Sequence, residues 1–302
     1  MPELPEVETV RLGLQPVLEG HVLTEVVTRR GDLRVPFPAN FAGRTKGCKV
    51  RALRRRAKYI LADLDSGETL VIHLGMSGRM SVYSEGKQRR IGSYVYDKAP
   101  EGAGNGKHDH VVFETDAPAR IIFNDHRRFG LMTLVETDRL DEDKLFKGMG
   151  IEPLSAGFIT AYLAKALDGK KTPIKSALLD QRLIAGLGNI YVCEALFRAG
   201  ISPKKLAGSI RHERLPPLVM AIKKVLKDAI AAGGSTLREH AQATGDPGNF
   251  QHHFLVYGRE GKPCKRPASS SKAVGDKISC KGTVKRIVQA GRSTFYCPKC
   301  QA

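Results

Sequence analysis

The hydrophobic pattern of the chain changes period twice, and this limits the folds that the sequence can adopt. Apolar residues near the N-terminus recur at helical spacing: Val7, Val10, Leu14 and Val17. Pro5 suits the first turn of this helix and Gly20 suits its end. From 21 to 135 the period is two, and from about Leu154 it is helical again. No internal repeat is visible. Because the strand-like segment is separate from the helical ones, the pattern predicts an α+β fold.

The middle of the chain reads as hairpins. Residues 59–64 and 69–74 flank the turn Asp65-Ser66-Gly67, and 111–114 pairs with 120–123 in the same way. These hairpins predict a β-sandwich, while the Gly-, Lys- and Pro-rich run 84–108 predicts a long mobile surface loop.

The helical pattern that follows predicts a second, mainly α part. Its apolar periods lie in four segments: 159–163, 174–183, 190–199 and 218–232. Gly233-Gly234-Ser235 ends the last of them.

The charge balance indicates the class of partner. Lys and Arg number 49 against 31 Asp and Glu, a net charge of +18, and 41% of residues are hydrophobic, so the chain is basic yet able to fold. A polyanion is the expected partner. The sequence contains no apolar stretch of membrane-spanning length and no secretory signal pattern, so we expect a cytoplasmic protein that does not enter membranes.

The C-terminal cysteines predict a metal site. Cys297 and Cys300 form a C-x2-C pair, and Cys280 precedes them at a distance suited to a zinc hairpin. Cys264 is the favoured fourth ligand, with His252 and His253 as alternatives. Lengthening the loop between Cys264 and Cys280 costs about 1.4 kcal/mol of closure entropy, whereas a structural zinc contributes on the order of 10 kcal/mol. A pair of disulfides is the structural alternative, which a reducing cytoplasm disfavours.

The N-terminus offers a candidate nucleophile. If Met1 is removed, Pro2 becomes a free secondary amine whose pKa near ~8 leaves about 10% unprotonated at neutral pH. Glu3 and Glu6 can converge on this amine and do acid/base work. From composition alone, Pro and Glu simply favouring a helix start is the stronger interpretation.

Five motifs occur in order along the chain and carry a resemblance. They are Pro2-Glu3-Leu4-Pro5-Glu6, His73-Leu74-Gly75-Met76-Ser77-Gly78, Asn124-Asp125-His126-Arg127-Arg128-Phe129-Gly130, the run 181–191 around Gly186-Leu187-Gly188-Asn189, and the run 291–301 that ends Cys297-Pro298-Lys299-Cys300-Gln301. With these motifs the chain resembles the bacterial formamidopyrimidine-DNA glycosylases over nearly its whole length. Leu4 favours this purine-directed branch over the sister endonuclease VIII family, which typically begins Pro-Glu-Gly-Pro-Glu.

The resemblance implies three domains and one structural Zn²⁺. A catalytic domain with an N-terminal helix and a β-sandwich would span 1–150. A helix-two-turns-helix domain with a lesion-recognition loop would span 151–258, and a zinc-finger β-hairpin 259–302. Within the second domain, residues 235–251 correspond to the mobile loop that closes over the extruded base.

The resemblance also implies the activity and its residues. The enzyme would be a DNA glycosylase and DNA-(apurinic or apyrimidinic site) lyase of base excision repair, acting on 8-oxoguanine and formamidopyrimidines in duplex DNA as a monomer associated with the nucleoid. Pro2 would form a Schiff base that permits β,δ-elimination, and Glu3 would move protons. The implied contacts to DNA come from Lys58, Met76, Arg127, Arg128, Phe129, Lys175, Asn189 and Arg292, with Lys58 and Arg292 counted in the catalytic set.

The implied DNA contacts divide into two kinds. Lys58, Asn189 and Arg292 match phosphate-binding positions, and Arg128 suits a phosphate better than a base. Met76, Arg127 and Phe129 match the residues that fill the vacancy left by a flipped base.

The residues alone leave other interpretations open. Lys58 could be a solvated strand lysine, Asn189 a helix cap, and Met76 and Phe129 ordinary core. His73 is either a buried strand histidine or a neighbour of the DNA backbone.

Two further functions fit the same sequence. One is a catalytically silent zinc protein that binds DNA. The other is an endonuclease VIII-like enzyme for oxidised pyrimidines.

Overall fold

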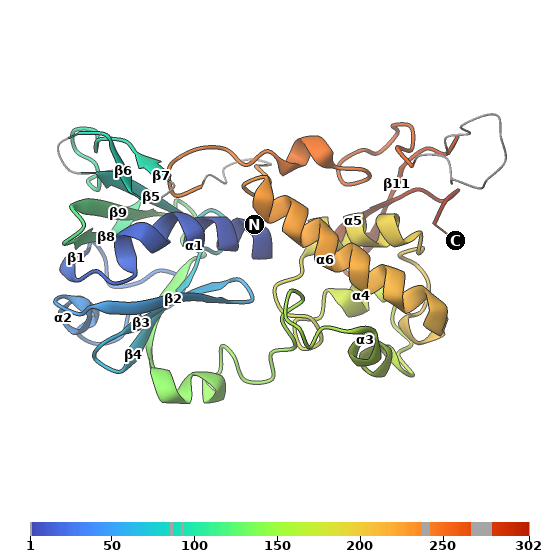
Figure 1. The fold of residues 1–302 in the computed structure, drawn as a ribbon, viewed down its shortest axis with the longest axis horizontal. Helices are drawn as coiled ribbons and strands as arrows, with labels where there is room; N and C mark the ends of the chain where they lie inside the picture. The colour runs from blue at the N-terminus through green and yellow to red at the C-terminus, as the bar shows by residue number, and fades with distance from the viewer. Residues whose placement is uncertain (1, 85–86, 92–93, 237–241, 267–279, 302) are drawn as a thin grey trace. The chain divides into compact units, whose positions relative to one another are not determined.

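The computed structural model describes residues 2–84, 87–91, 94–236, 242–266 and 280–301. The chain forms two compact units (Figure 1). The first contains Met1–Gly148 with Ala229–Gln251, and the second contains Met149–Asp228 with His252–Ala302. No helix in the described part of the chain is both long and apolar enough to cross a membrane.

The first unit is a helix packed on a β-sandwich, as the change of period predicts. Helix α1 spans Leu4–Leu18 and contacts strands β2 and β3. One sheet has the order β1-β8-β9-β5 and the other β10-β4-β3-β2, with antiparallel pairing throughout. The strand bounds are β1 Leu23–Thr28, β2 Val50–Arg56, β3 Tyr59–Leu64, β4 Glu68–His73, β5 Arg79–Ser84, β8 Asp109–Thr115, β9 Ala119–Asn124 and β10 Leu131–Glu136. This unit also contains the short helices α2 (Phe41–Thr45) and η1 (Thr137–Glu142).

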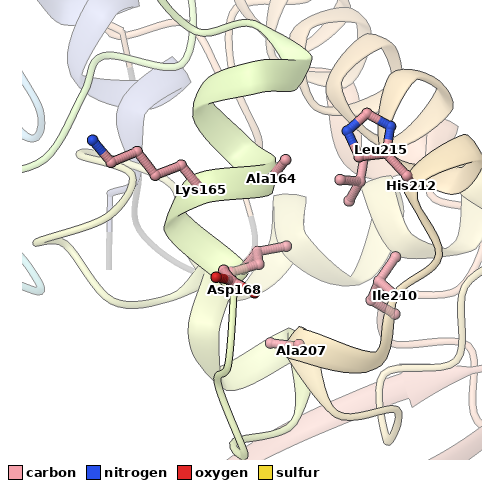
Figure 2. Close-up of a pocket in the computed structure, with 9 residues that line it drawn as sticks. Ala164, Lys165, Asp168, Ala207, Ile210, His212 and Leu215 are labelled. Carbon is pink, nitrogen blue, oxygen red and sulfur yellow. The ribbon is translucent and has the colours of Figure 1, made fainter.

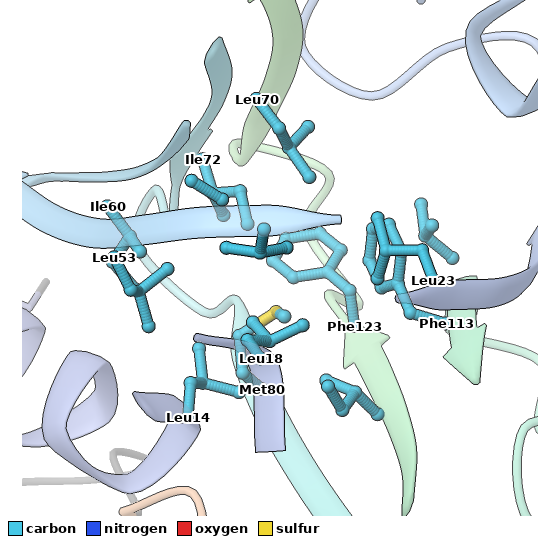
Figure 3. Packing of buried hydrophobic residues seen from close by; sticks show 14 of the residues in the cluster. Leu14, Leu18, Leu23, Leu53, Ile60, Leu70, Ile72, Met80, Phe113 and Phe123 are labelled. Atoms are coloured by element: carbon cyan, nitrogen blue, oxygen red, sulfur yellow. The ribbon is translucent and has the colours of Figure 1, made fainter. Parts of the chain in front are cut away.

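The core of the first unit lies between the two sheets and α1. Figure 3 shows side chains of both sheets and of α1 packed together, among them Leu14 of α1, Ile72 of β4 and Phe123 of β9. Leu14 and Phe123 are fully buried and Ile72 is 1% exposed. Burying such side chains contributes about 1.5–3 kcal/mol each relative to leaving them exposed, so this core fixes where α1 lies on the sheets.

The segment expected to be a long loop contains a hairpin. Strands β6 (Arg89–Ile91) and β7 (Tyr94–Tyr96) pair within 84–108, so the sequence interpretation as a plain loop was wrong. Tyr96 explains the difference, because its ring is fully buried in the sandwich core and its hydroxyl donates to the Gly13 carbonyl of α1 at 2.6 Å.

The second unit is mainly helical and ends in a two-stranded hairpin. It contains α3 (Thr160–Leu167), α4 (Ile174–Leu178), α5 (Asn189–Ala199), most of α6 (Leu215–Ala231), and the single turns η2 (Ala207–Ser209) and η3 (His212–Arg214). Strands β11 (Lys285–Gln289) and β12 (Arg292–Tyr296) form the hairpin, and the turn η4 (Phe250–His253) lies where the two units meet in sequence.

Helix α4 is shorter than the apolar period 174–183 predicts. The helix ends at Leu178, and the chain beyond it bonds to a segment distant in sequence: the Gly150 amide donates to the Gln181 carbonyl at 2.8 Å, and Ile184 pairs with Ile151 in an isolated bridge. These long-range bonds hold 181–184 outside the helix, and the periodicity of the sequence gives no sign of them.

Candidate active site and zinc centre

The N-terminus is fastened at the start of α1 by two buried glutamates. Pro2 is buried, and Glu3 and Glu6 are 4% and 2% exposed. Glu3 is the N-cap of α1 and forms a reciprocal capping box with Glu6, whose Oε2 accepts the Glu3 amide at 2.9 Å. The two carboxylates are therefore held next to Pro2. Met1 lies outside the described residues.

Glu6 also holds the segment that follows α6. Its Oε1 accepts the Ser235 amide at 2.8 Å, a bond between residues far apart in sequence but within the same unit. Both oxygens of Glu6 thus accept main-chain hydrogen bonds, an arrangement that favours a positioning role. Its role in proton transfer stays a prediction.

Part of the expected lesion-recognition loop, residues 237–241, lies outside the described residues. Its described end is anchored in the first unit. Ala243 is fully buried in the sandwich core, and its carbonyl accepts the Val82 amide at 2.8 Å.

Lys58 lies in the tight connection between β2 and β3. Arg56 pairs with Tyr59, so Ala57 and Lys58 form the turn, and Ala57 adopts a left-handed φ of +52°. Lys58 is 8% exposed, which argues against a freely solvated strand lysine. Its contact with DNA stays a prediction.

His73 lies beside this lysine and is kept neutral. Burial lowers the pKa of His73 to about 4, and the positive charges of Lys58 and Arg34 act in the same direction. Its Nδ1 accepts the Gly75 amide at 3.0 Å, which requires an unprotonated Nδ1. The half-buried ring packs on Tyr59 with 4.8 Å between centroids, so His73 is packed within the sheet, and its proximity to the DNA backbone stays a prediction.

Two loops present the residues expected to fill a vacated base position. Met76 is 44% exposed and Phe129 is 42% exposed, so neither is ordinary core. The guanidinium of Arg127 lies 4.7 Å from the Phe129 ring centroid, a cation–π contact that holds the two side chains together. Arg128 is also exposed and has a left-handed φ of +57°.

A fully buried carboxylate, Asp125, organises these two loops. Its Oδ1 accepts the Ser77 hydroxyl at 2.5 Å and its Oδ2 accepts the Gly130 amide at 2.8 Å. The Gly75 backbone lies against Phe129 and Gly130 so closely that a Cβ at this position would be 2.3 Å from the Phe129 carbonyl carbon. The loops bearing Met76 and Phe129 are therefore held together as one continuous surface.

The second unit carries the other predicted DNA contacts. Asn189 begins α5, and its Nδ2 donates to the Ser293 carbonyl at 2.9 Å. Arg292 is exposed next to Ser293 on β12, so α5 and the hairpin bring Asn189 and Arg292 near each other. Lys175 is fully buried in α4, and its contact with DNA stays a prediction.

The four C-terminal cysteines form a zinc centre. Their sulfur atoms all lie within 4.8 Å of one another, with Cys264 to Cys300 and Cys280 to Cys297 both at 3.7 Å. A tetrahedral Zn²⁺ with Zn–S bonds of ~2.3 Å has edges of ~3.8 Å, whereas a disulfide needs about 2.05 Å. No disulfide joins any two of these four described cysteines, so the disulfide alternative is wrong.

The donor set of this centre is all sulfur. Cys264 belongs to the cluster formed among the described residues, and the exposed His252 and His253 do not. Gly282 lies close to it, because a Cβ there would be 2.6 Å from the Cys297 sulfur. The site therefore suits one structural Zn²⁺ that holds the β11–β12 hairpin. The linker run 265–272 lies outside the described residues from 267 onward.

A shallow pocket of about 330 Å³ also lies in the second unit (Figure 2). Ala164, Lys165 and Asp168 of the α3 region line one side, and Ala207, Ile210, His212 and Leu215 line the other. These elements differ from those that carry Asn189, Arg292 and the cysteines, so the pocket is not part of the predicted site.

Comparisons with known proteins agree with this arrangement. Family models match in sequence order: the formamidopyrimidine-DNA glycosylase N-terminal domain at 1–132, the formamidopyrimidine-DNA glycosylase H2TH domain at 149–241, and the zinc finger found in FPG and IleRS at 278–302. The formamidopyrimidine-DNA glycosylase of Ruegeria sp. (strain TM1040) is 56% identical over 301 residues, covering 100% of both chains. The chain belongs to the formamidopyrimidine-DNA glycosylase family.

Solved structures of this glycosylase family extend the likeness to the fold. Lactococcus lactis Fpg in complex with abasic-site DNA is 30% identical with a TM-score of 0.81, covering 99% of each chain. MutM in complex with DNA containing carbocyclic 8-oxo-G is also 30% identical, with a TM-score of 0.80 and 99% of each chain covered. The protein is thus a DNA repair enzyme, a DNA glycosylase with lyase activity at abasic sites, and the expected α+β fold with its zinc hairpin is confirmed.

Three residues of this glycosylase escaped the sequence interpretation. Asp125 stands in a quoted motif, yet only the structure shows that it joins two loops. Tyr96 stands in the insertion 84–108, where a Tyr-Val-Tyr strand was the available signal. Glu194 is fully buried on α5, and no local pattern identifies its role.

Proposed function

We propose that this glycosylase removes oxidised purines, 8-oxoguanine and formamidopyrimidines, from duplex DNA in base excision repair. The observation that carries the proposal is the N-terminus of α1, where Pro2 adjoins a buried pair of carboxylates, Glu3 and Glu6. A reactive amine with two acids beside it is the arrangement that Schiff-base chemistry on a sugar needs.

Pro2 is the proposed nucleophile once Met1 is removed. An α-amine with a pKa near ~8 is about 10% unprotonated at pH 7, against well under 0.1% for an ordinary lysine near ~10.4. The amine needs no further tuning to attack a carbon centre.

The proposed chemistry proceeds through a covalent intermediate. The Pro2 nitrogen bonds to C1′ of the damaged nucleotide, and the glycosidic bond breaks as the base leaves with a proton. The sugar ring opens to give an iminium at C1′. Loss of a proton from C2′ then expels the 3′ phosphate, and a second elimination expels the 5′ phosphate. Glu3, beside the amine, moves the protons of base loss and ring opening.

DNA is held by two proposed groups of residues. Met76 and Phe129 enter the stack at the vacated position, and Arg127 hydrogen-bonds the orphaned cytosine. Their exposure and the shared Asp125 anchor support this proposal. Lys58, Arg128, Asn189 and Arg292 bind phosphates, and Lys175 supports DNA binding in the second domain.

The proposed domain limits follow these roles. Residues 1–150 are the catalytic domain, 151–258 the helix-two-turns-helix domain, and 259–302 the zinc hairpin.

The deciding experiment is borohydride trapping on a duplex that carries 8-oxoguanine opposite cytosine. We expect a covalent adduct that peptide mapping places on Pro2, and none with a Pro2→Leu variant, in which the larger second residue keeps Met1 in place and leaves the nitrogen of residue 2 in a peptide bond. An adduct on an internal lysine, or an intact mass showing that Met1 or an acyl group remains on the active enzyme, would refute the mechanism.

Substrate preference is tested separately. Parallel duplexes with an oxidised pyrimidine should be cleaved more slowly than those with 8-oxoguanine. The reverse order would favour an endonuclease VIII-like enzyme. We also propose a cytoplasmic, nucleoid-associated monomer, which sedimentation of the free enzyme and of its DNA complex checks.

A further inference from the structure

Helix α5 carries a buried carboxylate that grips the chain segment before the zinc hairpin. Glu194 is fully buried on α5. Its Oε1 accepts the amides of Leu255, Val256 and Tyr257 at 2.9–3.0 Å, and its Oε2 also accepts the Leu255 amide at 3.0 Å. Three successive N–H groups thus converge on one carboxylate, as in an anion-binding nest of main-chain donors.

This grip compensates for a costly burial. Burial raises the pKa of Glu194, while the three amides and the charge of Arg198 act in the opposite direction. A carboxylate kept in such a place has to be satisfied by its hydrogen bonds, since a buried acceptor left unmade is strongly unfavourable. The amides of 255–257 are those partners, so the segment cannot move away from α5 without exposing the carboxylate.

The gripped segment is part of the core around the zinc centre. Val256 is fully buried and packs in one cluster with Cys264, Cys297 and Val284, together with Phe197 of α5. The zinc ligands hold β11 and β12 to each other, whereas Glu194 holds this core to α5. Metal and carboxylate therefore perform separate tasks within the same unit.

A second contact joins α5 to the hairpin next to Arg292. Asn189, five residues before Glu194 on α5, donates from Nδ2 to the Ser293 carbonyl at 2.9 Å. Ser293 follows Arg292 directly on β12. The backbone next to Arg292 is thus hydrogen-bonded to α5 at the first residue of the helix, and the segment 255–257 is hydrogen-bonded to α5 at Glu194.

We propose that Glu194 is a positioning residue for Arg292, setting where the zinc hairpin presents its guanidinium to a DNA phosphate. The inference rests on the proposed phosphate contact of Arg292. Zinc determines that the hairpin folds, and Glu194 determines its placement on α5.

A double-mutant cycle tests this inference on the full chain, with binding measured to a duplex that carries an abasic-site analogue. Glu194→Gln keeps the shape but turns one acceptor into an amide donor that faces the main-chain N–H groups. We expect zinc content to stay at one per chain while the Kd rises about tenfold, the size of one lost phosphate contact. In an Arg292→Ala background the same change should alter Kd less than about twofold, because coupled residues are not additive.

The matched control is Glu213→Gln, the same carboxylate-to-amide change on an exposed residue of the same unit. Glu213 pairs with Arg211 at 3.0 Å in solvent, so its loss should leave Kd within about twofold. If Glu194→Gln fails to fold, Glu194→Asp keeps the charge but shortens the reach to the three amides, and we expect a smaller rise in Kd with the same coupling.

Two outcomes separate the inference from the function on which it rests. If Arg292→Ala weakens binding but Glu194→Gln does not, or if the two losses add, the positioning role is wrong and the phosphate contact stands. If Arg292→Ala leaves Kd unchanged, the phosphate contact itself is wrong and the inference falls with it.

Discussion

Gly75→Ala should uncouple the two loops that present Met76 and Phe129. Gly75 has a φ of +65°, and a Cβ there would lie 2.3 Å from the Phe129 carbonyl carbon, 2.4 Å from its oxygen and 2.5 Å from the Gly130 nitrogen. All three are main-chain atoms, which cannot rotate out of the way. Ordinary contact begins about 3.4 Å away, so the Phe129–Gly130 backbone must retreat by roughly 1 Å.

The cost has two parts. An alanine in the left-handed region costs about 1–2 kcal/mol wherever it stands. Retreat of Gly130 also breaks two hydrogen bonds. One is donated by the Gly130 amide to Asp125 at 2.8 Å, and the other is accepted by the Gly130 carbonyl from the Arg34 amide at 3.0 Å. Leaving such buried groups unpaired costs about 1–3 kcal/mol each. The two parts sum to roughly 3–8 kcal/mol, and we expect the free energy of unfolding to fall by an amount within that range.

The matched control is Gly67→Ala in the turn between β3 and β4. Gly67 has a φ of +86°, but a Cβ at this position would have nothing within 4 Å, so the variant reports the backbone strain alone. Urea unfolding of both variants separates strain from contact. Single-turnover excision of 8-oxoguanine opposite cytosine then reports whether Phe129 still reaches the stack. Equal unfolding energies for the two variants, or full excision by Gly75→Ala, would refute the reasoning.

Three further perturbations test other parts of the structure. As the pH falls from about 6.5 to 4, the free energy of unfolding should fall by up to ~3 kcal/mol, because the lowered pKa of His73 lets only the unfolded chain bind the proton. In a His73→Gln variant, urea unfolding across this range should show a weaker dependence of the unfolding free energy on pH. An unchanged pH dependence would contradict the role of His73. Ala57→Gly should raise the unfolding free energy by about 0.5–1 kcal/mol, because it relieves the strain of a residue with a φ of +52°. Ala62→Gly inside β3 is the control and should lower the unfolding free energy. Thermal melts in which Ala62→Gly is the more stable of the two variants would exclude this account. Cys264→Ser should reduce bound zinc well below one per chain and weaken DNA binding, and metal analysis that finds the full content would reopen the fourth ligand.

Much of the fold could be predicted because its signals are local. The hairpins at 59–74 and 111–123 follow from alternating apolar residues and short turns, and β3, β4, β8 and β9 confirm them. Helix α5 ends at Ala199, and Gly200 after it adopts the left-handed φ of +68° that glycine permits at a helix C-terminus. The failures, at α4 and at the hairpin β6–β7, occur where a partner distant in sequence changes the local outcome.

The candidate site divides in the same way. Pro2 and Glu3 were visible as a motif because their chemistry needs adjacent residues, and the C-x2-C pair was visible because metal ligands repeat at short spacing. The exposure of Met76 and Phe129 was not, because a sequence cannot tell a buried apolar residue from one that stands in solvent.

By itself, then, the sequence determined the order of the parts and the zinc hairpin, and it supplied the proposed nucleophile Pro2, all of which rest on residues that are near neighbours in the chain. Tertiary structure alone decided that Cys264 completes the metal site, that Asp125 joins two loops, and that Glu194 holds the segment before the hairpin. The physical reason is common to all three. A buried polar group or a metal ligand is defined by partners that reach it across the fold, and the chain must be folded before those partners exist.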